Sequence, residues 1–302
     1  FRPAAFAPRA DLGEFARKLL KSERPPGPAF HAGHQFIDEV ESLIGPITLE
    51  EYHLESTTET IDEPSILSWS GLSTYMRCPL KYRWQYELRL KGSPSKSMKI
   101  GIFVHEVIEK FSKKHLGSNE NQHMDEIIES VLNKYVNTLP IFSPGDLDEM
   151  RKWLDEWQQS EHQCNDSRKV THIEEEIEFE FHEVKFRGKI DRVEEDEDGR
   201  LTLIDFKTSR SKNLKKPGSK GQEQLLLYAF AWHQIHGRMP DRVSLNYISK
   251  GKEFTVELTP LMMERELGNL VEPIELLMAG DRTPNKGHCR WCDLASICPE
   301  RA

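Results

Sequence analysis

The chain has 302 residues, of which 37% are hydrophobic and 30% are charged, and these proportions fit one large globular domain or two smaller ones. Its apolar runs, such as LLLYAFAW at 225–232, are too short to cross a bilayer, and five cysteines are too few for a secreted disulfide framework, so we expect no membrane partner and a reducing intracellular compartment such as the cytoplasm. Taken alone, the net charge of −9 argues against nucleic-acid binding, although positive charge gathers locally at 81–99 and 210–220.

Residues 1–65 have the composition of an N-terminal arm or linker, because the stretches FRPAAFAPRA and SERPPGPAF are too rich in proline to build a core. We expect the folded domain to occupy 66–302. Its first part predicts helical segments within 68–88, 98–115 and roughly 122–160, because apolar residues recur there at helical spacing. The second helix is expected to be entered through Gly101, and the third region to break at TLPIFSPGD, 138–146.

Beyond this helical region the apolar residues alternate with polar ones, as they do in strands. Alternation in EEIEFEFHEVKFRGKIDRVEE and in LTLIDFKTS predicts strands, and Asp198-Gly199 predicts the hairpin turn before the return strand. The remainder predicts a helix at 222–236, strands at 241–249 and 253–258, and a closing helix at 263–279. The hairpin therefore brings GKIDRV next to LIDFKTS.

Three charged residues of the predicted hairpin, Asp191, Asp205 and Lys207, form a candidate catalytic group. Residues two apart on a strand share a face, so Asp205 and Lys207 project the same way, and Asp191 faces them across the ladder if the register permits. Two carboxylates on one face repel each other unless a cation lies between them, and oxygen ligands favour Mg²⁺ or Mn²⁺. A lysine two residues further on can orient a water and offset charge on a phosphate. Together these groups are suited to phosphodiester hydrolysis.

Each of these residues also has an ordinary structural interpretation. Surface strands often carry Asp and Lys, and a lone histidine such as His105, on the apolar helix at 98–115, is more often packed in a core than bound to a metal. Gln224 and Tyr228 lie one helical turn apart, so they share a helix face that is either interfacial or in contact with a DNA backbone. The residues alone leave both interpretations open.

Three of the five cysteines lie in the last fourteen residues, at Cys289, Cys292 and Cys298, with the spacing C-x2-C-x5-C. A disulfide cannot use three thiols, and a metal centre usually takes four ligands. A fourth ligand is therefore expected elsewhere in the chain.

Five short motifs follow one another along the chain. They are Ser68-x-Ser70-x-Leu72-x-x-Tyr75-x-x-Cys78-Pro79-x-x-Tyr82, Gly101-x-x-x-His105, Gly188-Lys189-Ile190-Asp191-Arg192, Asp205-Phe206-Lys207-Thr208 and Gln224-x-x-x-Tyr228. In this order they resemble the motifs of RecB-type nucleases in the PD-(D/E)XK superfamily, and in particular those of its iron–sulfur subgroup, such as the AddB and AdnB nuclease domains. Each motif is weak alone, and many relatives have Glu at the position of Asp205. The resemblance covers roughly 66–302.

The resemblance implies an α/β fold with a restriction-endonuclease-like core, in which helices flank a central mixed sheet, with a helical insertion and a C-terminal iron–sulfur clamp. It also implies metal-dependent cleavage of DNA, with Mg²⁺ or Mn²⁺ held by His105, Asp191, Asp205 and the backbone carbonyl of Phe206. The catalytic residues that it implies are Asp191, Asp205, Lys207, Gln224 and Tyr228, and Lys207 would handle the water nucleophile.

In the iron-containing relatives, one early cysteine and a C-terminal C-x2-C-x5-C bind a [4Fe–4S] cluster, so the resemblance assigns the cluster to Cys78, Cys289, Cys292 and Cys298. Four thiolates also suit zinc, and the residues alone do not separate the two metals. The clamp would join Cys78 to Cys289, which is 289 − 78 = 211 positions away. By analogy with a disulfide, closing such a loop is worth roughly 5 kcal/mol, enough for a purely structural role. Cys164, expected in the loop SEHQCNDS, is left over as structural or free.

Two basic stretches offer a path for DNA. KYRWQYELRLKGSPSKSMK at 81–99 interleaves basic residues with aromatic ones, and SRSKNLKKPGSKG at 209–221 predicts a flexible loop directly after the active-site strand. The candidate DNA contacts are Arg83, Lys91, Lys212, Lys215 and Lys216. Aromatic residues such as Trp84 fit a core at least as well as a DNA surface.

The leading hypothesis is a metal-dependent nuclease that acts on single-stranded DNA or DNA ends in repair or recombination, with a helicase domain or subunit as a further partner, since relatives are often fused to one. A second hypothesis is a DNA-binding or scaffolding domain of the same fold without catalysis, which the intact Asp191, Asp205 and Lys207 argue against. A third is a zinc-clamped interaction module with coincidental hairpin acids, which the ordered motifs argue against.

Overall fold

The computed structural model of the protein describes residues 66–90, 95–117, 124–135, 142–164, 168–219 and 221–301. The chain divides into two compact units. The core unit comprises Ile66–Trp69 and Pro94–Glu272, and the cysteine unit contains Ser70–Ser93 and Pro273–Ala302. The predicted arm at 1–65 lies outside the described residues. Within the described ranges, no helix has both the length and the apolar character that a membrane crossing requires.

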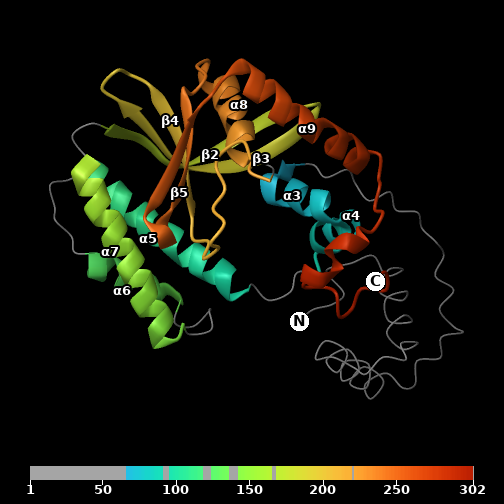
Figure 1. The fold of residues 1–302 in the computed structure, drawn as a ribbon, viewed down its shortest axis with the longest axis horizontal. Helices are drawn as coiled ribbons and strands as arrows, with labels where there is room; N and C mark the ends of the chain where they lie inside the picture. Colours follow the sequence, from blue (N-terminus) through green and yellow to red (C-terminus); the bar gives the residue numbers. More distant parts are fainter. Residues whose placement is uncertain are drawn as a thin grey trace, which may run out of the picture. The chain divides into compact units, whose positions relative to one another are not determined.

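Helices of the core unit form where the sequence predicts apolar stripes. They are α5 (Lys96–Gly117), α6 (Met124–Tyr135), α7 (Pro144–Cys164), α8 (Gln224–His236) and the larger part of α9 (Pro260–Met278), drawn in Figure 1. The predicted break at 138–146 is confirmed, because α6 ends before it and α7 begins inside it. Cys164, which was expected in a loop, is instead the last residue of α7.

The entry of α5 differs from the prediction. Gly101 does not begin this helix but lies within it, because α5 already starts at Lys96. The hydroxyl oxygen of Ser95 accepts a hydrogen bond from the amide of Met98 at 3.2 Å and so satisfies one of the unpaired donors of the first turn. A Cβ atom at Gly101 would lie 3.5 Å from the hydroxyl of Thr208, which is ordinary contact.

A reciprocal cap starts α7. The hydroxyl of Ser143 accepts from the amide of Asp146 at 3.3 Å, and the carboxylate of Asp146 accepts from the amide of Ser143 at 3.0 Å. Pro144 occupies the first helical position, where no amide partner is needed. The ammonium of Lys96 lies 2.7 Å from the same carboxylate, so Asp146 joins the starts of α5 and α7.

A six-stranded mixed sheet forms the centre of the core unit. Its strands are β1 (Leu67–Ser68), β2 (Arg168–Phe181), β3 (Val184–Asp196), β4 (Leu201–Lys207), β5 (Arg242–Tyr247) and β6 (Lys252–Glu257). The order is β1-β3-β4-β5-β6, and β2 pairs with β3. The pairs β1–β3 and β4–β5 are parallel, whereas β2–β3, β3–β4 and β5–β6 are antiparallel. The predicted central mixed sheet is therefore confirmed.

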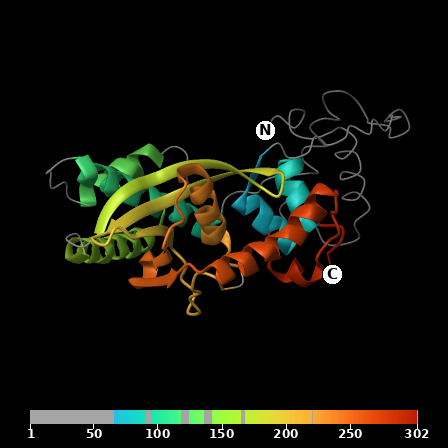
Figure 2. The same cartoon turned by 90° about the horizontal axis from the view of Figure 1, so that it is seen from above.

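Strand β3 is paired along the whole of one edge but only in two separate stretches along the other. β2 pairs along one edge, and Figure 2 shows the two strands as one long curved hairpin. The other edge pairs with β1 at Phe186 and Arg187 and with β4 from Arg192 to Glu195. The segment 188–191 lies between these two stretches, so the described strands leave the ladder open along the GKID sequence.

Tight turns connect the strands of the hairpins. Between β3 and β4, the carboxylate of Asp196 accepts the amide of Arg200 at 2.8 Å and Gly199 has φ +74°, which confirms the predicted turn. Between β2 and β3, His182 and Glu183 have φ +49° and +61°. Positive φ at both central residues is typical of a type I′ turn, which favours Asn and Gly. Since neither is present, the sequence contains no signal for this turn.

The hydrophobic core of the core unit lies between α5, α6, α7 and one face of β4. Phe206 is buried in this cluster, with its ring centroid 6.0 Å from that of Trp157 on α7. Because successive strand residues point to opposite faces, Asp205 and Lys207 project away from the cluster. The apolar helix α8 packs against β2, β4 and β5.

The cysteine unit is built from short helical segments. They are α3 (Trp69–Arg77, which begins in the core unit), α4 (Pro79–Tyr82), the π-helical turn η2 (Arg83–Glu87) and the 3₁₀ turn η4 (Lys286–Trp291). Trp84, Leu88 and Leu294 form its apolar centre. Trp84 and Tyr82 are both buried, so their placement in a core is confirmed and their stacking on DNA bases is not supported.

Candidate active site and cysteine cluster

Strand β4 presents Asp205 and Lys207 on one face, as the alternation predicts. The ammonium of Lys207 lies 2.6 Å from Asp205 Oδ2 and forms an ion pair with it. Lys207 also donates to Gln224 Oε1 on α8 at 3.4 Å. Asp205 is 5% exposed. Its carboxylate is therefore buried against the ammonium of Lys207.

Burial and pairing set the charges of these two groups. Burial raises the pKa of Asp205, and the neighbouring Lys207 partly opposes this. Burial lowers the pKa of Lys207, but the carboxylates of Asp205 and Asp191 outweigh it, so the pKa of this lysine is raised. Lys207 is thus held as an ammonium ion, which suits it to neutralise anionic charge rather than to accept a proton.

Asp191 lies where β3 and β4 separate. The pair that ends their ladder on this side is Arg192 with Ile204, and Asp191 is the residue of β3 directly before Arg192. Beyond this pair, Asp191 Oδ2 takes the place of a backbone acceptor and receives the amide of Phe206 at 2.7 Å. This bond fixes the carboxylate beside the strand that carries Asp205.

His105 reaches the same place from α5. Its Nδ1 lies 3.6 Å from Asp191 Oδ1, and its Nε2 lies 2.9 Å from the carbonyl oxygen of Phe206. Burial lowers the pKa of the imidazole, but Asp191 outweighs this and raises the pKa of His105 to about 9. The ring therefore contacts polar groups rather than lying in the apolar core. Asp191 and the Phe206 carbonyl together create a place that favours positive charge.

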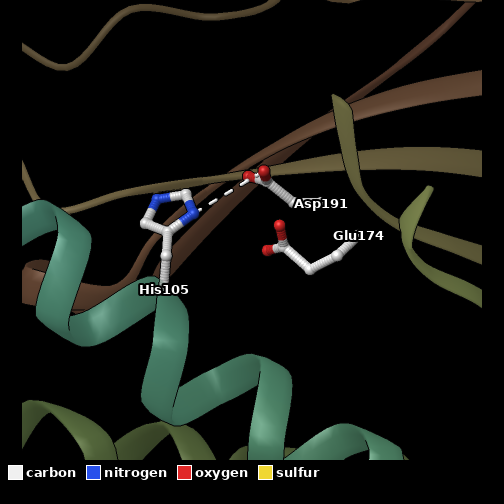
Figure 3. A group of neighbouring side chains, drawn as sticks. All are labelled: His105, Glu174 and Asp191. Carbon is white, nitrogen blue, oxygen red and sulfur yellow. Dashed lines mark ion pairs between the residues drawn. The ribbon is translucent and has the colours of Figure 1, made fainter. Parts of the chain in front are cut away.

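A third carboxylate, from β2, joins this group, although it was not among the residues predicted from the sequence. Glu174 offers an oxygen within 4.8 Å of ligand atoms of His105 and Asp191. Figure 3 shows the three side chains directed toward one another. Lys189 lies 2.6 Å from the Glu174 carboxylate, whose pKa is raised by burial. Three glutamates stand in a row at 174–176, and no sequence signal singles out the first of them.

This donor set fits a hard divalent cation. Carboxylate and carbonyl oxygens with one imidazole are ligands that Mg²⁺ or Mn²⁺ accepts. Of the predicted metal ligands, His105 contacts both Asp191 and the Phe206 carbonyl, and Asp191 accepts a hydrogen bond from the Phe206 amide. Asp205 instead forms an ion pair with Lys207. The roles of all these groups toward a metal stay predictions.

Helix α8 covers the site through Gln224 and Tyr228. Tyr228 is buried, and burial raises the pKa of its hydroxyl. A Cβ atom on Gly188 would lie 2.6 Å from the Tyr228 ring, so the tyrosine packs directly on the GKID segment. Gln224 contacts Lys207, as described above. Both residues thus lie beside the predicted catalytic group, while their expected contacts to DNA stay predictions.

Cys78, Cys289, Cys292 and Cys298 line one pocket in the cysteine unit. All four are half-buried free thiols. Burial raises the pKa of Cys292 and of Cys298, so these thiols need a nearby cation to become thiolates. Four thiols around one pocket suit an iron–sulfur cluster or zinc.

Polar contacts hold the walls of this pocket. The amide of Asn285 donates to Cys78 Sγ at 3.4 Å, and its side chain donates to the carbonyl of Arg77 at 2.9 Å. Lys81 forms an ion pair with Asp293. These contacts join residues that are 207 to 212 positions apart. The C-terminal segment is therefore tied to the segment around Cys78 by the protein's own groups.

The predicted DNA contacts fall into two groups. Lys212, Lys215 and Lys216 are exposed on the loop after β4. On this loop, the hydroxyl of Tyr247 accepts the amide of Lys215 at 3.1 Å and donates to its carbonyl at 3.0 Å, while the predicted flexibility of the loop stays a prediction. Arg83 is half-buried in η2, and Lys91 lies outside the described residues.

The mixed sheet thus carries carboxylates from three strands, a lysine beside them and a histidine from α5 at the open edge of β3. The family model described as "PD-(D/E)XK nuclease superfamily" matches residues 66–299, and the chain belongs to this superfamily. The crystal structure of a candidate exonuclease from Eubacterium rectale is similar in fold, with a TM-score of 0.52 and 13% identity over 83% of this chain and 92% of that chain. The structure of SSO0001 has a TM-score of 0.38 and 15% identity over 89% of this chain and 97% of that one, too little to carry an argument. No curated protein sequence matches the chain.

Proposed function

We propose that the protein is a divalent-metal-dependent deoxyribonuclease that hydrolyses phosphodiester bonds. The observation that carries this proposal is the convergence of Asp191, Asp205 and Lys207 beside the open edge of β3, with His105 contacting Asp191 from α5. Groups of this kind stabilise the negative charge that develops on a phosphate under attack. The intact set also argues against an inactive DNA-binding domain of the same fold.

The chain's own residues have separable tasks in this reaction. Bound Mg²⁺ or Mn²⁺ would supply Lewis-acid chemistry and a more acidic water. His105, Asp191 and the Phe206 carbonyl would hold the cation, with Asp205 next to them. Lys207, kept charged by Asp205, would offset charge on the water nucleophile and the phosphate. Gln224 contacts the same ammonium from α8 and so restricts its direction.

We place this activity on single-stranded DNA or DNA ends, in repair or recombination. Exposed Lys212, Lys215 and Lys216 follow the catalytic strand, and the anchoring of their loop by Tyr247 supports a defined phosphate path. The description of the Eubacterium rectale structure as an exonuclease is consistent with action at ends. A helicase partner belongs to the same proposal and rests on the motif resemblance alone.

We further propose that Cys78, Cys289, Cys292 and Cys298 bind a structural [4Fe–4S] cluster. Their spacing and their shared pocket support this assignment. Zinc is the alternative, because the same four thiols suit it. A reducing compartment is part of this proposal, since the thiols must stay free to bind metal.

The test uses the full chain purified without oxygen and incubated with end-labelled single-stranded DNA and Mg²⁺ or Mn²⁺. Brown protein that cuts DNA, with cleavage lost in Asp205→Ala, is the expected result. Colourless, zinc-containing protein that cuts DNA would support the nuclease proposal and contradict the iron–sulfur cluster. Protein that binds DNA but cuts it with neither metal would favour the inactive DNA-binding domain.

A further inference from the structure

We propose that Glu174, which lies outside the five sequence motifs, is a direct ligand of the catalytic cation and completes a three-sided site with His105 and Asp191. This inference rests on the proposed metal-dependent activity and adds a residue to the metal centre. Ligand atoms of the three side chains all lie within 4.8 Å of one another. An octahedral cation with metal–oxygen distances of about 2.1 Å holds its ligands roughly 3 to 4 Å apart. Small side-chain movements would therefore close this set around one ion.

The backbone of Glu174 has a conformation that sheet packing alone does not require. Its φ is +52° although it lies inside β2. Its neighbours Ile173 and Glu175 pair with Arg192 and Ile190, so the register places Glu174 across from Asp191. The left-handed conformation is unfavourable for a residue other than glycine, and such strain gathers at functional sites. The strain is thus located at the residue whose carboxylate meets His105 and Asp191.

The charges around the site leave room for a cation at its centre. Glu174, Asp191 and Asp205 stand on the adjacent strands β2, β3 and β4. Lys189 lies 2.6 Å from Glu174, just as Lys207 lies 2.6 Å from Asp205. In the described part of the chain, Asp191 has an ion pair with His105 and none with a lysine or arginine. Lys189 and Lys207 offset two of the three carboxylates, and the third, Asp191, is paired with an imidazole, a group that can itself bind a divalent cation.

A purely structural role for Glu174, as the partner of Lys189, accounts for less of this arrangement. The side chain of Glu174 is 10% exposed, whereas that of Lys189 is 44% exposed. Burying a carboxylate is unfavourable, and an ion pair with a half-exposed lysine offsets only a small part of that unfavourable free energy. Lys189 contacts Oε2, one of the two carboxylate oxygens, and so orients the group. A bound cation would supply the missing compensation.

Binding of Mn²⁺ to the full chain without DNA tests this role, measured by calorimetry and by the electron paramagnetic resonance signal of free Mn²⁺. The variants are Glu174→Gln, Lys189→Gln and Glu176→Gln, the last an exposed glutamate on the same strand. We expect Glu174→Gln to weaken Mn²⁺ binding by about tenfold or more. Lys189→Gln removes the ion pair but keeps the carboxylate, so it should bind Mn²⁺ at least as tightly as the wild type, and Glu176→Gln should match the wild type.

Glu174→Asn guards against a loss that reflects misfolding, because Asn tolerates the left-handed backbone but lacks the charge and the reach. Weaker binding in both Glu174 variants, with unchanged melting, supports the ligand role. Glu174 variants that bind Mn²⁺ as tightly as Glu176→Gln would overturn the ligand role. If Asp191→Asn nevertheless abolished Mn²⁺ binding and cleavage, the proposed function would still stand. An equal loss of Mn²⁺ affinity in Glu174→Gln and Lys189→Gln would show that Glu174 acts through its ion pair with Lys189 and would overturn its role as a metal ligand. A wild type that neither binds Mn²⁺ nor cuts DNA would overturn the proposed function itself.

Discussion

The carboxylate of Asp191 accepts the backbone amide of Phe206 at 2.7 Å, just beyond the point where β3 and β4 stop pairing. One oxygen of Asp191 thus substitutes for a strand partner, while the other faces His105 at 3.6 Å. Because Phe206 lies between Asp205 and Lys207, this bond couples the positions of all the predicted catalytic groups on both strands.

Lys207→Met should destabilise the protein as well as stop cleavage, because it leaves the Asp205 carboxylate buried without its cation. Breaking a buried pair costs about 3 to 5 kcal/mol, and we expect the lower end or less because the Lys207 side chain is 31% exposed. The double variant with Asp205→Asn buries no charge, so its free energy of unfolding should return toward the wild type. Urea denaturation measures both variants, and equal losses in them would show that the pair is not coupled.

Gly188→Ala should disturb the contact between the GKID segment and α8. The added methyl group would lie 2.6 Å from the ring of Tyr228, so one of the two elements must shift. Overpacking of this kind costs about 1 to 3 kcal/mol, and the shift should lower cleavage because Asp191 follows closely on β3. Gly145→Ala is the control, since nothing lies within 4 Å of the added group in α7. Thermal denaturation that fails to separate the two variants would contradict this packing.

Asp146→Asn should make the protein's stability less sensitive to acid. Lys96 first, and then Ser143, lower the pKa of Asp146 from 3.8 to about 2. A carboxyl group with a lowered folded pKa stabilises the fold above its unfolded pKa and loses that contribution as the pH falls toward the folded value. The wild type should therefore lose more stability than Asp146→Asn between about pH 4 and pH 2. Melting curves recorded across this pH range test the prediction. Equal decreases in the melting temperatures of the two proteins would argue against a stabilising role for the Asp146 carboxylate.

Cys78→Ser should lower both the metal content and the melting temperature. A metal held by the four cysteines closes a long loop, which by analogy with a disulfide is worth roughly 5 kcal/mol. Cys164→Ser serves as the control, because the predicted cluster does not use the fifth cysteine. Elemental analysis for iron and zinc, together with thermal denaturation, measures the effect. A variant with all four cluster cysteines replaced and an unchanged melting temperature would contradict the clamp.

The predictions that the structure supports depend mainly on local chain geometry. Alternation along β4 is enough to put Asp205 and Lys207 on one face and Phe206 on the other. The predicted turn at Gly199 then sets the register that brings Asp191 across from them. A strand and its neighbouring turn contain all of this information, so a single sequence suffices to predict it.

The residues that the sequence did not indicate depend on unusual backbone or on distant contacts. Glu174 enters the site with φ +52°, and the turn before β3 uses positive φ at His182 and Glu183, which non-glycine residues seldom adopt. The burial of Trp84 depends on Leu294, far along the chain. An interleaved pattern of aromatic and basic residues cannot reveal such a partner.

Cleavage of end-labelled single-stranded DNA at increasing Mg²⁺ or Mn²⁺ concentrations, in the wild type and in Asp205→Asn, tests the proposed catalytic centre most directly. We expect wild-type cleavage to require the metal and to stop on chelation, and we expect cleavage to fall by about 100-fold or more in Asp205→Asn at a temperature at which this variant is still folded. Cleavage that persists without divalent metal, or that Asp205→Asn leaves unchanged, would contradict a metal-dependent nuclease centred on Asp191, Asp205 and Lys207.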